Sequence, residues 1–174
     1  MIYAVLDTNV LVSYMLAKHS DSKVVKCVDL VRSKTIIPLY NDVILREYEE
    51  VLHREHFGLE ESRIVDLMSL FRTNGINCEK KAVNEYFPDP DDAVFYEVAM
   101  SRDDSYLVTG NLKHFPKNGR VVSPAEMLQI IEFGGKPVSY LSDTEAPEYL
   151  PMSLEEINAI IREVREEMRA RKDL

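Results

Sequence analysis

Short apolar runs alternate with amphipathic stretches along the first part of the chain. Residues 2–6 are almost continuously apolar, the pattern of a strand buried on both faces of a parallel sheet. Thr8 or Asn9 follows and is placed to cap a helix that runs to residue 16. This alternation of strand and helix predicts a parallel sheet with helices on both faces. Further strands are expected near residues 35–39, 76–78, 105–109 and 120–122.

The stretches between these runs show helical spacing of apolar residues. Gly75 follows one of them and is expected to end that helix in the left-handed conformation. Residues 136–151 are polar and contain prolines, which indicates a linker or a surface strap. Ser153 then begins a capping-box pattern, and an apolar stripe runs from Leu154 to Met168. This last stripe could pack on its own domain or on a partner surface, and the sequence leaves both open.

Composition adds few constraints. A chain of 174 residues fits one compact domain. Cys27 and Cys78 lie far apart, so neither a disulfide framework nor a metal-binding cysteine pair is indicated. No apolar run reaches the length of a membrane span, and the short run at residues 2–6 lacks the basic leader of a signal peptide. We therefore expect a cytoplasmic protein with no membrane contact.

Polar residues gather where the predicted strands end. Asp7 closes the first strand, Thr109 and Asn111 close the strand near residue 107, and Asp92 begins the helix before that strand. Glu47 lies on the helix after the second strand. Open parallel sheets bind ligands at the carboxyl ends of their strands, so these side chains could meet at one edge.

Each of these residues also has an ordinary structural interpretation. Asp7 and Asp92 could be helix caps, Glu47 a solvated charge, and Asn111 a turn residue. Together, however, three acids around one cleft would repel one another unless a cation neutralised them. A site made only of oxygen ligands favours Mg²⁺ or Mn²⁺ over zinc.

The net charge of −9 argues against a protein that binds nucleic acid broadly, because such binding relies on cationic groups. It argues less against a metal-dependent nuclease. Carboxylates that hold divalent ions present positive charge to a substrate.

Four motifs in order resemble those of the PIN-domain family: Leu6–Val10, Ile44–Leu52, Pro88–Asp92 and Leu107–Asn111. The run from Asp89 to Asp92, with Leu107 to Pro116, is similar to a PIN group described as toxin components of toxin–antitoxin systems. The resemblance covers about residues 1–133. Residues 134–174 then form a linker and a C-terminal helical extension.

The resemblance implies a three-layer α/β/α fold with a five-stranded parallel sheet in the order 3-2-1-4-5, plus the extra C-terminal helix. It implies a Mg²⁺- or Mn²⁺-dependent endoribonuclease that hydrolyses RNA phosphodiester bonds, often as a homodimer, with an antitoxin protein as a possible partner. Asp7, Glu47 and Asp92 match the catalytic, metal-binding acids of the family. The position of a fourth acid is held by Asn111, a candidate metal ligand, or by His114. Supporting or substrate-binding roles fall to Thr8, Asn9, Arg46, Asp91, Thr109, Lys113 and His114.

Two alternatives remain open at this point. The missing fourth acid and the acidic composition would also suit a PIN module that binds RNA or a protein without catalysis. A metal-dependent phosphohydrolase of small molecules has less support, because Asn9 stands where a phosphoaspartyl enzyme would carry a second Asp and no glycine-rich phosphate loop is present.

Overall fold

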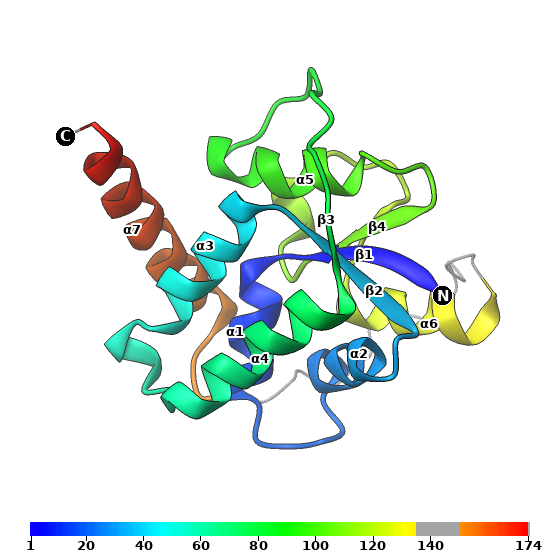
Figure 1. Ribbon diagram of the computed structural model, residues 1–174, viewed down its shortest axis with the longest axis horizontal. Helices are drawn as coiled ribbons and strands as arrows, with labels where there is room; N and C mark the ends of the chain where they lie inside the picture. Colours follow the sequence, from blue (N-terminus) through cyan, green and yellow to red (C-terminus); the bar gives the residue numbers. More distant parts are fainter. Residues whose placement is uncertain (135–149, 174) are drawn as a thin grey trace.

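The structure is a computed structural model that describes residues 1–134 and 150–173. A five-stranded parallel sheet forms its centre, in the order β3-β2-β1-β4-β5 (Figure 1). Both the parallel sheet and its strand order confirm the expectation from the sequence. The strands are β1 (Ile2–Leu6), β2 (Ile36–Tyr40), β3 (Ile76–Asn77), β4 (Ser105–Val108) and β5 (Val121–Val122).

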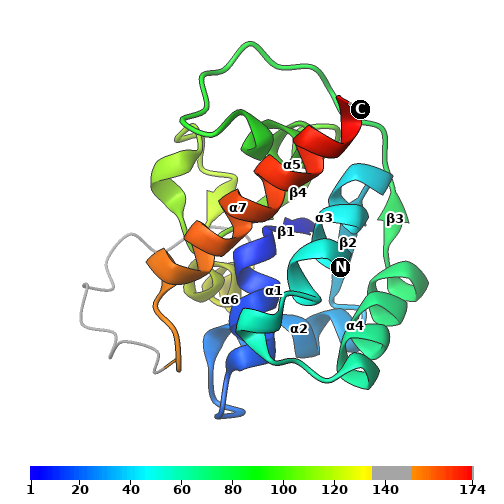
Figure 2. The same ribbon diagram turned by 90° about the vertical axis from the view of Figure 1, so that its left-hand side faces the viewer.

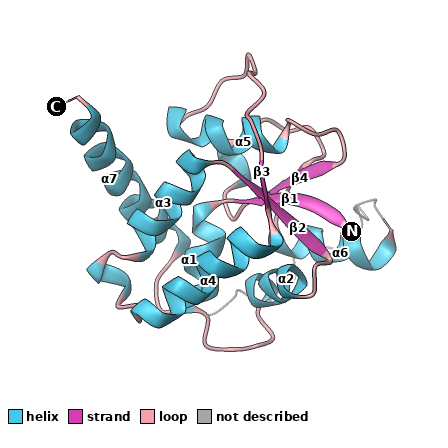
Figure 3. Cartoon of the chain, viewed as in Figure 1, coloured by secondary structure: helices cyan, strands magenta, loops and turns pink. Residues whose placement is uncertain are grey.

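Helices surround this sheet (Figure 3). Helix α5 packs against β1, β2 and β4 on one face, while α2, α4 and α6 lie toward the other face (Figure 1). The α-helices are α1 (Thr8–Leu16), α2 (Lys23–Arg32), α3 (Asp42–Leu52), α4 (Glu61–Asn74), α5 (Ala93–Ala99), α6 (Pro124–Phe133) and α7 (Leu154–Lys172). Three short 3₁₀ turns are η1 (Glu55–Phe57), η2 (Pro90–Asp92) and η3 (Leu112–His114).

Strand β1 is central, and its register determines which strand ends come together. Leu6 lies opposite Val108 of β4, and the backbone N–H of Asp7 donates to the Val108 carbonyl at 2.8 Å. Asp7 and Thr109 therefore leave their strands side by side. The apolar run of β1 needs this central place, because Ala4, Val5 and Leu6 are fully buried.

Helix α7 packs across α1 and α3 of its own chain (Figure 2). Ser153 caps it through the expected capping box with Glu156, and Ile157, Ile161 and Val164 are buried. The apolar stripe thus packs on its own domain. The predicted linker of residues 136–151 lies almost entirely outside the described residues.

Two local predictions were wrong. Helix α1 begins at Thr8, so neither Thr8 nor Asn9 is its cap, and Asp7 occupies the N-cap position without capping through its side chain. Gly75 does end α4, but in an extended conformation with φ −102°. The need for glycine is steric: a Cβ there would lie 2.6 Å from the carbonyl oxygens of Phe71 and Pro38.

Gly75→Ala should therefore destabilise the fold by about 2 to 3 kcal/mol, because both close atoms belong to the backbone and cannot turn away. Gly119→Ala is the matched control. Gly119 has φ +73° but no atom within 4 Å of an added Cβ, so only backbone strain of about 1 kcal/mol is expected. Urea unfolding measures both, and equal losses would contradict the steric explanation.

Candidate active site

Asp7 lies at the carboxyl end of β1 and is buried. Its Oδ2 accepts hydrogen bonds from the Thr109 hydroxyl at 2.7 Å and from the Asn9 amide at 2.9 Å. The first bond follows from the β1–β4 register. Asn9 in turn accepts from the backbone N–H of Gly110 at 3.0 Å, which ties the two strand ends together. Thr109 and Asn9 therefore hold this carboxylate in place.

Glu47 reaches the same place from α3. The neighbouring Tyr48 is fully buried and donates its hydroxyl hydrogen bond to the carbonyl of Leu6, the last residue of β1. This contact fixes α3 against the end of β1. Glu47 is consequently only 5% exposed, and its Oε1 accepts from the Thr8 hydroxyl at 2.6 Å.

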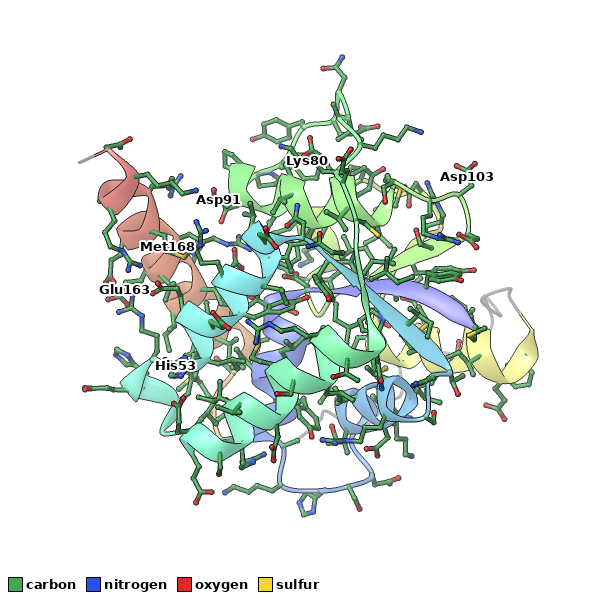
Figure 4. The ribbon with its side chains drawn as sticks, viewed as in Figure 1. His53, Lys80, Asp91, Asp103, Glu163 and Met168 are labelled. Carbon is green, nitrogen blue, oxygen red and sulfur yellow. The ribbon has the colours of Figure 1, made fainter. Side chains whose placement is uncertain are left out.

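Asp92 is the third predicted acid and is 3% exposed. It ends the 3₁₀ turn η2, where Pro90 and the Asp89 side-chain cap shape the backbone before α5. The imidazole Nδ1 of His114 lies 3.1 Å from its Oδ2. The neighbouring Asp91, predicted to have a supporting or substrate-binding role, is labelled in Figure 4, and its Oδ2 lies 3.5 Å from Nη1 of Arg169 in α7.

Arg165 of α7 links Glu47 and Asp92. Its Nε and Nη2 lie 3.1 and 2.9 Å from the two carboxylate oxygens of Glu47, a side-on bidentate pair. Its Nη1 donates to Asp92 Oδ1 at 2.7 Å and to Asp89 Oδ2 at 3.0 Å. The guanidinium is buried and lies 5.7 Å from the ring centroid of Phe95. One cation thus contacts three carboxylates.

The charged forms of the acids are disfavoured in spite of this cation. Burial, followed by the charge of Asp92, raises the pKa of Asp7 from 3.8 to about 6. Burial also raises the pKa of Glu47 and of Asp92, although the guanidinium acts in the opposite direction on both. Burial lowers the pKa of Arg165, but attraction to Glu47 and Asp92 outweighs it and the pKa lies above its ordinary value. The single positive charge of Arg165 therefore does not balance the carboxylates of the cluster.

The ordinary interpretations of the three acids do not hold in this geometry. Asp7 and Asp92 occupy N-cap positions, yet neither side chain makes a capping hydrogen bond. Glu47 is buried instead of solvated. None of the three carboxylates caps a helix or lies in solvent, and all three lie in one buried cluster. This arrangement is typical of a functional site.

A small cavity of about 20 Å³ lies beside the cluster, which is room for one water molecule. Asp7, Asp92, Asn111 and His114 line it together with Asn158 and Arg165 of α7. The structure thus places Asn111 and His114 beside the acids. Arg46 and Lys113, which were predicted among the supporting or substrate-binding residues, are exposed.

The cluster is not arranged as a metal site while Arg165 is in place. Within residues 1–134 and 150–173, no three or more His, Cys, Asp or Glu side chains form a group that could hold a metal ion. The donor chemistry suits a hard divalent cation, but the guanidinium occupies the space between Glu47 and Asp92. The predicted ligand roles of Asp7, Glu47, Asp92 and Asn111 stay predictions.

Comparison with known proteins agrees with this geometry. A family model described as PIN domain matches residues 3–113, well over half of the chain. The chain belongs to the PIN-domain family. PIN domains are generally nucleases, and those nucleases typically use divalent metal ions. Searches of curated proteins and of solved structures each found no match.

The match to the PIN model ends at residue 113, before α7, and no residue of α7 was predicted to belong to the site. Arg165, Asn158 and Asp89 were all missed. A signal for Arg165 was present: it lies four residues after Ile161 and three before Met168, on the apolar side of the helix. A charge on that side must meet partners when the helix packs.

Among the described helices of this PIN protein, none is both long and apolar enough to cross a membrane.

Asp7→Asn should stabilise the metal-free protein at neutral pH. The folded pKa of Asp7 is raised to about 6, so its contribution to stability is fully present below about pH 3.8 and is lost as pH rises through about 6. The neutral amide avoids this loss. We expect a gain in the free energy of unfolding of about 1 to 2 kcal/mol near pH 7.5 and a smaller gain near pH 5, measured by urea unfolding in EDTA.

The matched control is Asp103→Asn, which changes an exposed carboxylate far from the cluster (Figure 4). It should alter the free energy of unfolding by less than about 0.5 kcal/mol at either pH. A gain for Asp7→Asn that grows as the pH falls would contradict the assigned cost of burying this charge.

Proposed function

We propose that this PIN domain is a metal-dependent endoribonuclease that hydrolyses phosphodiester bonds in RNA. The observation that carries the proposal is the meeting of three buried carboxylates, from Asp7, Glu47 and Asp92, at the carboxyl edge of the sheet. That edge is where open parallel sheets bind their ligands. The family supports the reaction class, because PIN domains are generally nucleases.

The energetics of the cluster support a functional origin. Buried acids that repel one another reduce stability, and apolar residues of similar size would pack at lower cost. Groups with shifted pKa values gather at functional sites because catalysis and ligand binding use them. The raised pKa values of Asp7, Glu47 and Asp92 fit this pattern.

The three acids would hold Mg²⁺ or Mn²⁺ once the Arg165 side chain has left the space between them. A bound ion would supply the charge that activates a water and stabilises the departing 3′-oxygen. The expected products carry a 5′-phosphate and a 3′-hydroxyl. Thr109 and Asn9 orient Asp7, and Thr8 orients Glu47, so the chain holds two of the acids rigidly through hydroxyl and amide donors.

Substrate contacts would come from residues at the opening of the site. Asn111 and His114 line the cavity beside Asp92, and the exposed Arg46 and Lys113 are suited to RNA phosphates. The net charge of −9 disfavours nonspecific binding. A structured or defined RNA target therefore suits this protein better than RNA in general.

A toxin role is the narrower form of this proposal. It rests on the likeness of the motifs at Asp89–Asp92 and Leu107–Pro116 to the toxin group of PIN proteins. In that role the protein would have an antitoxin partner, would work in the cytoplasm and would form a homodimer. An adjacent gene for a small protein that binds this chain would support it.

A PIN module without catalysis is the second candidate. The specific observation in its favour is the buried guanidinium of Arg165 among the acids, together with Asn111 and His114 where relatives carry a fourth acid. Such a module would bind RNA or a protein but would neither bind Mn²⁺ nor cleave RNA.

Asp7→Asn should reduce Mn²⁺-dependent cleavage of a labelled structured RNA by at least about 100-fold, because it removes one of the acids that hold the ion. EDTA should have the same effect on the unchanged protein. Gel analysis of the products, with identification of their 5′ and 3′ ends, measures the reaction.

Glu49→Gln is the matched control. It lies on α3 near Glu47, but its carboxylate pairs with Arg72 at the surface. This variant should cleave RNA as the parent does. Full activity of folded Asp7→Asn, checked by circular dichroism, would overturn the catalytic proposal. Turnover of generic phosphate esters without RNA cleavage would favour the small-molecule phosphohydrolase.

A further inference from the structure

Helix α7 supplies none of the residues to which the nuclease proposal gives a catalytic role. We propose that α7 is a built-in inhibitor of the site, in which Arg165 takes the place of the divalent ion and the helix closes the path for RNA. The inference rests on the proposed function, since it assigns a regulatory state to that same site. It concerns residues outside the matched family region of 3–113.

The contacts of Arg165 carry the first step. Its guanidinium contacts Glu47 and Asp92, which are two of the three candidate metal ligands, and it also contacts Asp89. A bidentate pair and two further charge-assisted bonds hold it there. A metal ion and this side chain cannot occupy the same oxygens at once. The docked helix and the bound ion are therefore mutually exclusive.

The charge balance shows why an ion can displace the side chain. Arg165 brings one positive charge to a cluster that includes Asp7, Glu47, Asp89 and Asp92. Asp7 receives no hydrogen bond from the guanidinium among the contacts described, and hydroxyl and amide donors hold it instead. A divalent ion would bring twice the charge of the guanidinium to the same oxygens. Exchange of arginine for the ion therefore relieves repulsion that the docked helix leaves in place.

A role in stability alone explains Arg165 poorly. The residue lies in the buried stripe of α7 between Ile161 and Met168, and apolar residues in place of both the arginine and its acidic partners would pack there without desolvating any charge. Replacing a buried ion pair by apolar residues is often neutral or stabilising. What the arginine adds is contact with the candidate metal ligands.

The position of the helix also limits access. Asn158, Ile161 and Arg165 of α7 form part of the wall of the 20 Å³ cavity beside the acids. Pockets that take a nucleotide-sized ligand enclose about 300 Å³ or more. With α7 docked on α1 and α3 (Figure 2), Asp7 is buried and the space beside it has room for a water molecule but not for an RNA phosphate.

The outer contacts of α7 are of a kind that can open. Arg54 pairs with Glu167, and Arg171 pairs with Glu50 at 3.0 Å, and all four side chains are partly exposed at the surface. Solvent-exposed pairs contribute little and weaken with salt. The C-terminal end of α7 lies at the outside of the molecule (Figure 1).

Competition has a reciprocal consequence. If docking of α7 weakens ion binding by some factor, ion binding weakens docking by the same factor. The apparent affinity for the ion falls in proportion to the fraction of molecules with the site open. The affinity for the ion and the docking of α7 can both be measured without RNA.

The test uses the full chain and its Arg165→Gln variant, with MnCl₂ as the probe. Titration calorimetry should show Mn²⁺ binding at least about tenfold tighter in Arg165→Gln than in the parent. Lys172→Gln removes a charge from the exposed end of the same helix and should bind as the parent does. In the parent, Mn²⁺ should speed amide hydrogen exchange across residues 154–172. Unchanged or weaker binding by folded Arg165→Gln would overturn the inference.

A second variant covers the case in which Arg165→Gln fails to fold. Arg54→Gln combined with Arg171→Gln loosens the rim of α7 and leaves the cluster and Arg165 intact. It should bind Mn²⁺ more tightly than the parent, by a smaller factor, and exchange faster across α7. Parent-like Mn²⁺ binding in this double variant, with α7 exchange already accelerated, would reject competition between helix and ion.

RNA cleavage separates this inference from the proposed function. Tighter Mn²⁺ binding by Arg165→Gln without RNA cleavage would retain the inhibitor and reject the ribonuclease. Cleavage by the parent as fast as by Arg165→Gln at the same subsaturating Mn²⁺ would retain the ribonuclease and reject the inhibitor. A gain in both binding and cleavage supports the two together.

Discussion

Mutual repulsion among buried carboxylates is the constraint on which the centre of this protein depends. Asp7, Glu47 and Asp92 come from separate parts of the chain and are each almost excluded from solvent. Such a group can persist only with strong donors or a cation beside it. Thr8, Asn9 and Thr109 supply the donors, and Arg165 supplies the cation. The residues at this edge of the sheet are therefore arranged to supply hydrogen-bond donors and a cation to the buried carboxylates.

The sheet and much of the cluster could be predicted because their causes are local. The run at residues 2–6 is apolar on both faces, so it had to be an inner strand, and Asp7 directly after it had to lie at a strand end. The pairing of Asp7 with Thr109 then follows from parallel register. The burial of Glu47 could not be predicted from the local sequence, because it depends on the contact of Tyr48 with the carbonyl of Leu6 across the fold.

What the sequence did not disclose depends on contacts between distant segments. Arg165 is 118 residues from Glu47, and no periodicity links the two. Helical spacing showed that α7 had an apolar face but could not choose between its own domain and a partner. Gly75 was expected to supply a left-handed turn, whereas close backbone approach from Pro38 requires it. The start of α1 was misplaced because Asp7 holds the N-cap position while its side chain faces the cluster.

The order of these residues along the chain has a consequence for how the protein is made. Arg165 follows Asp92 by 73 residues, and every acid of the cluster precedes it. Synthesis runs from the N-terminus, and folding can begin before it is finished. The acids therefore leave the ribosome before the arginine that meets them. A product ended early, by a stop codon or by proteolysis ahead of Arg165, would differ from the full protein in the charge of its centre as well as in length.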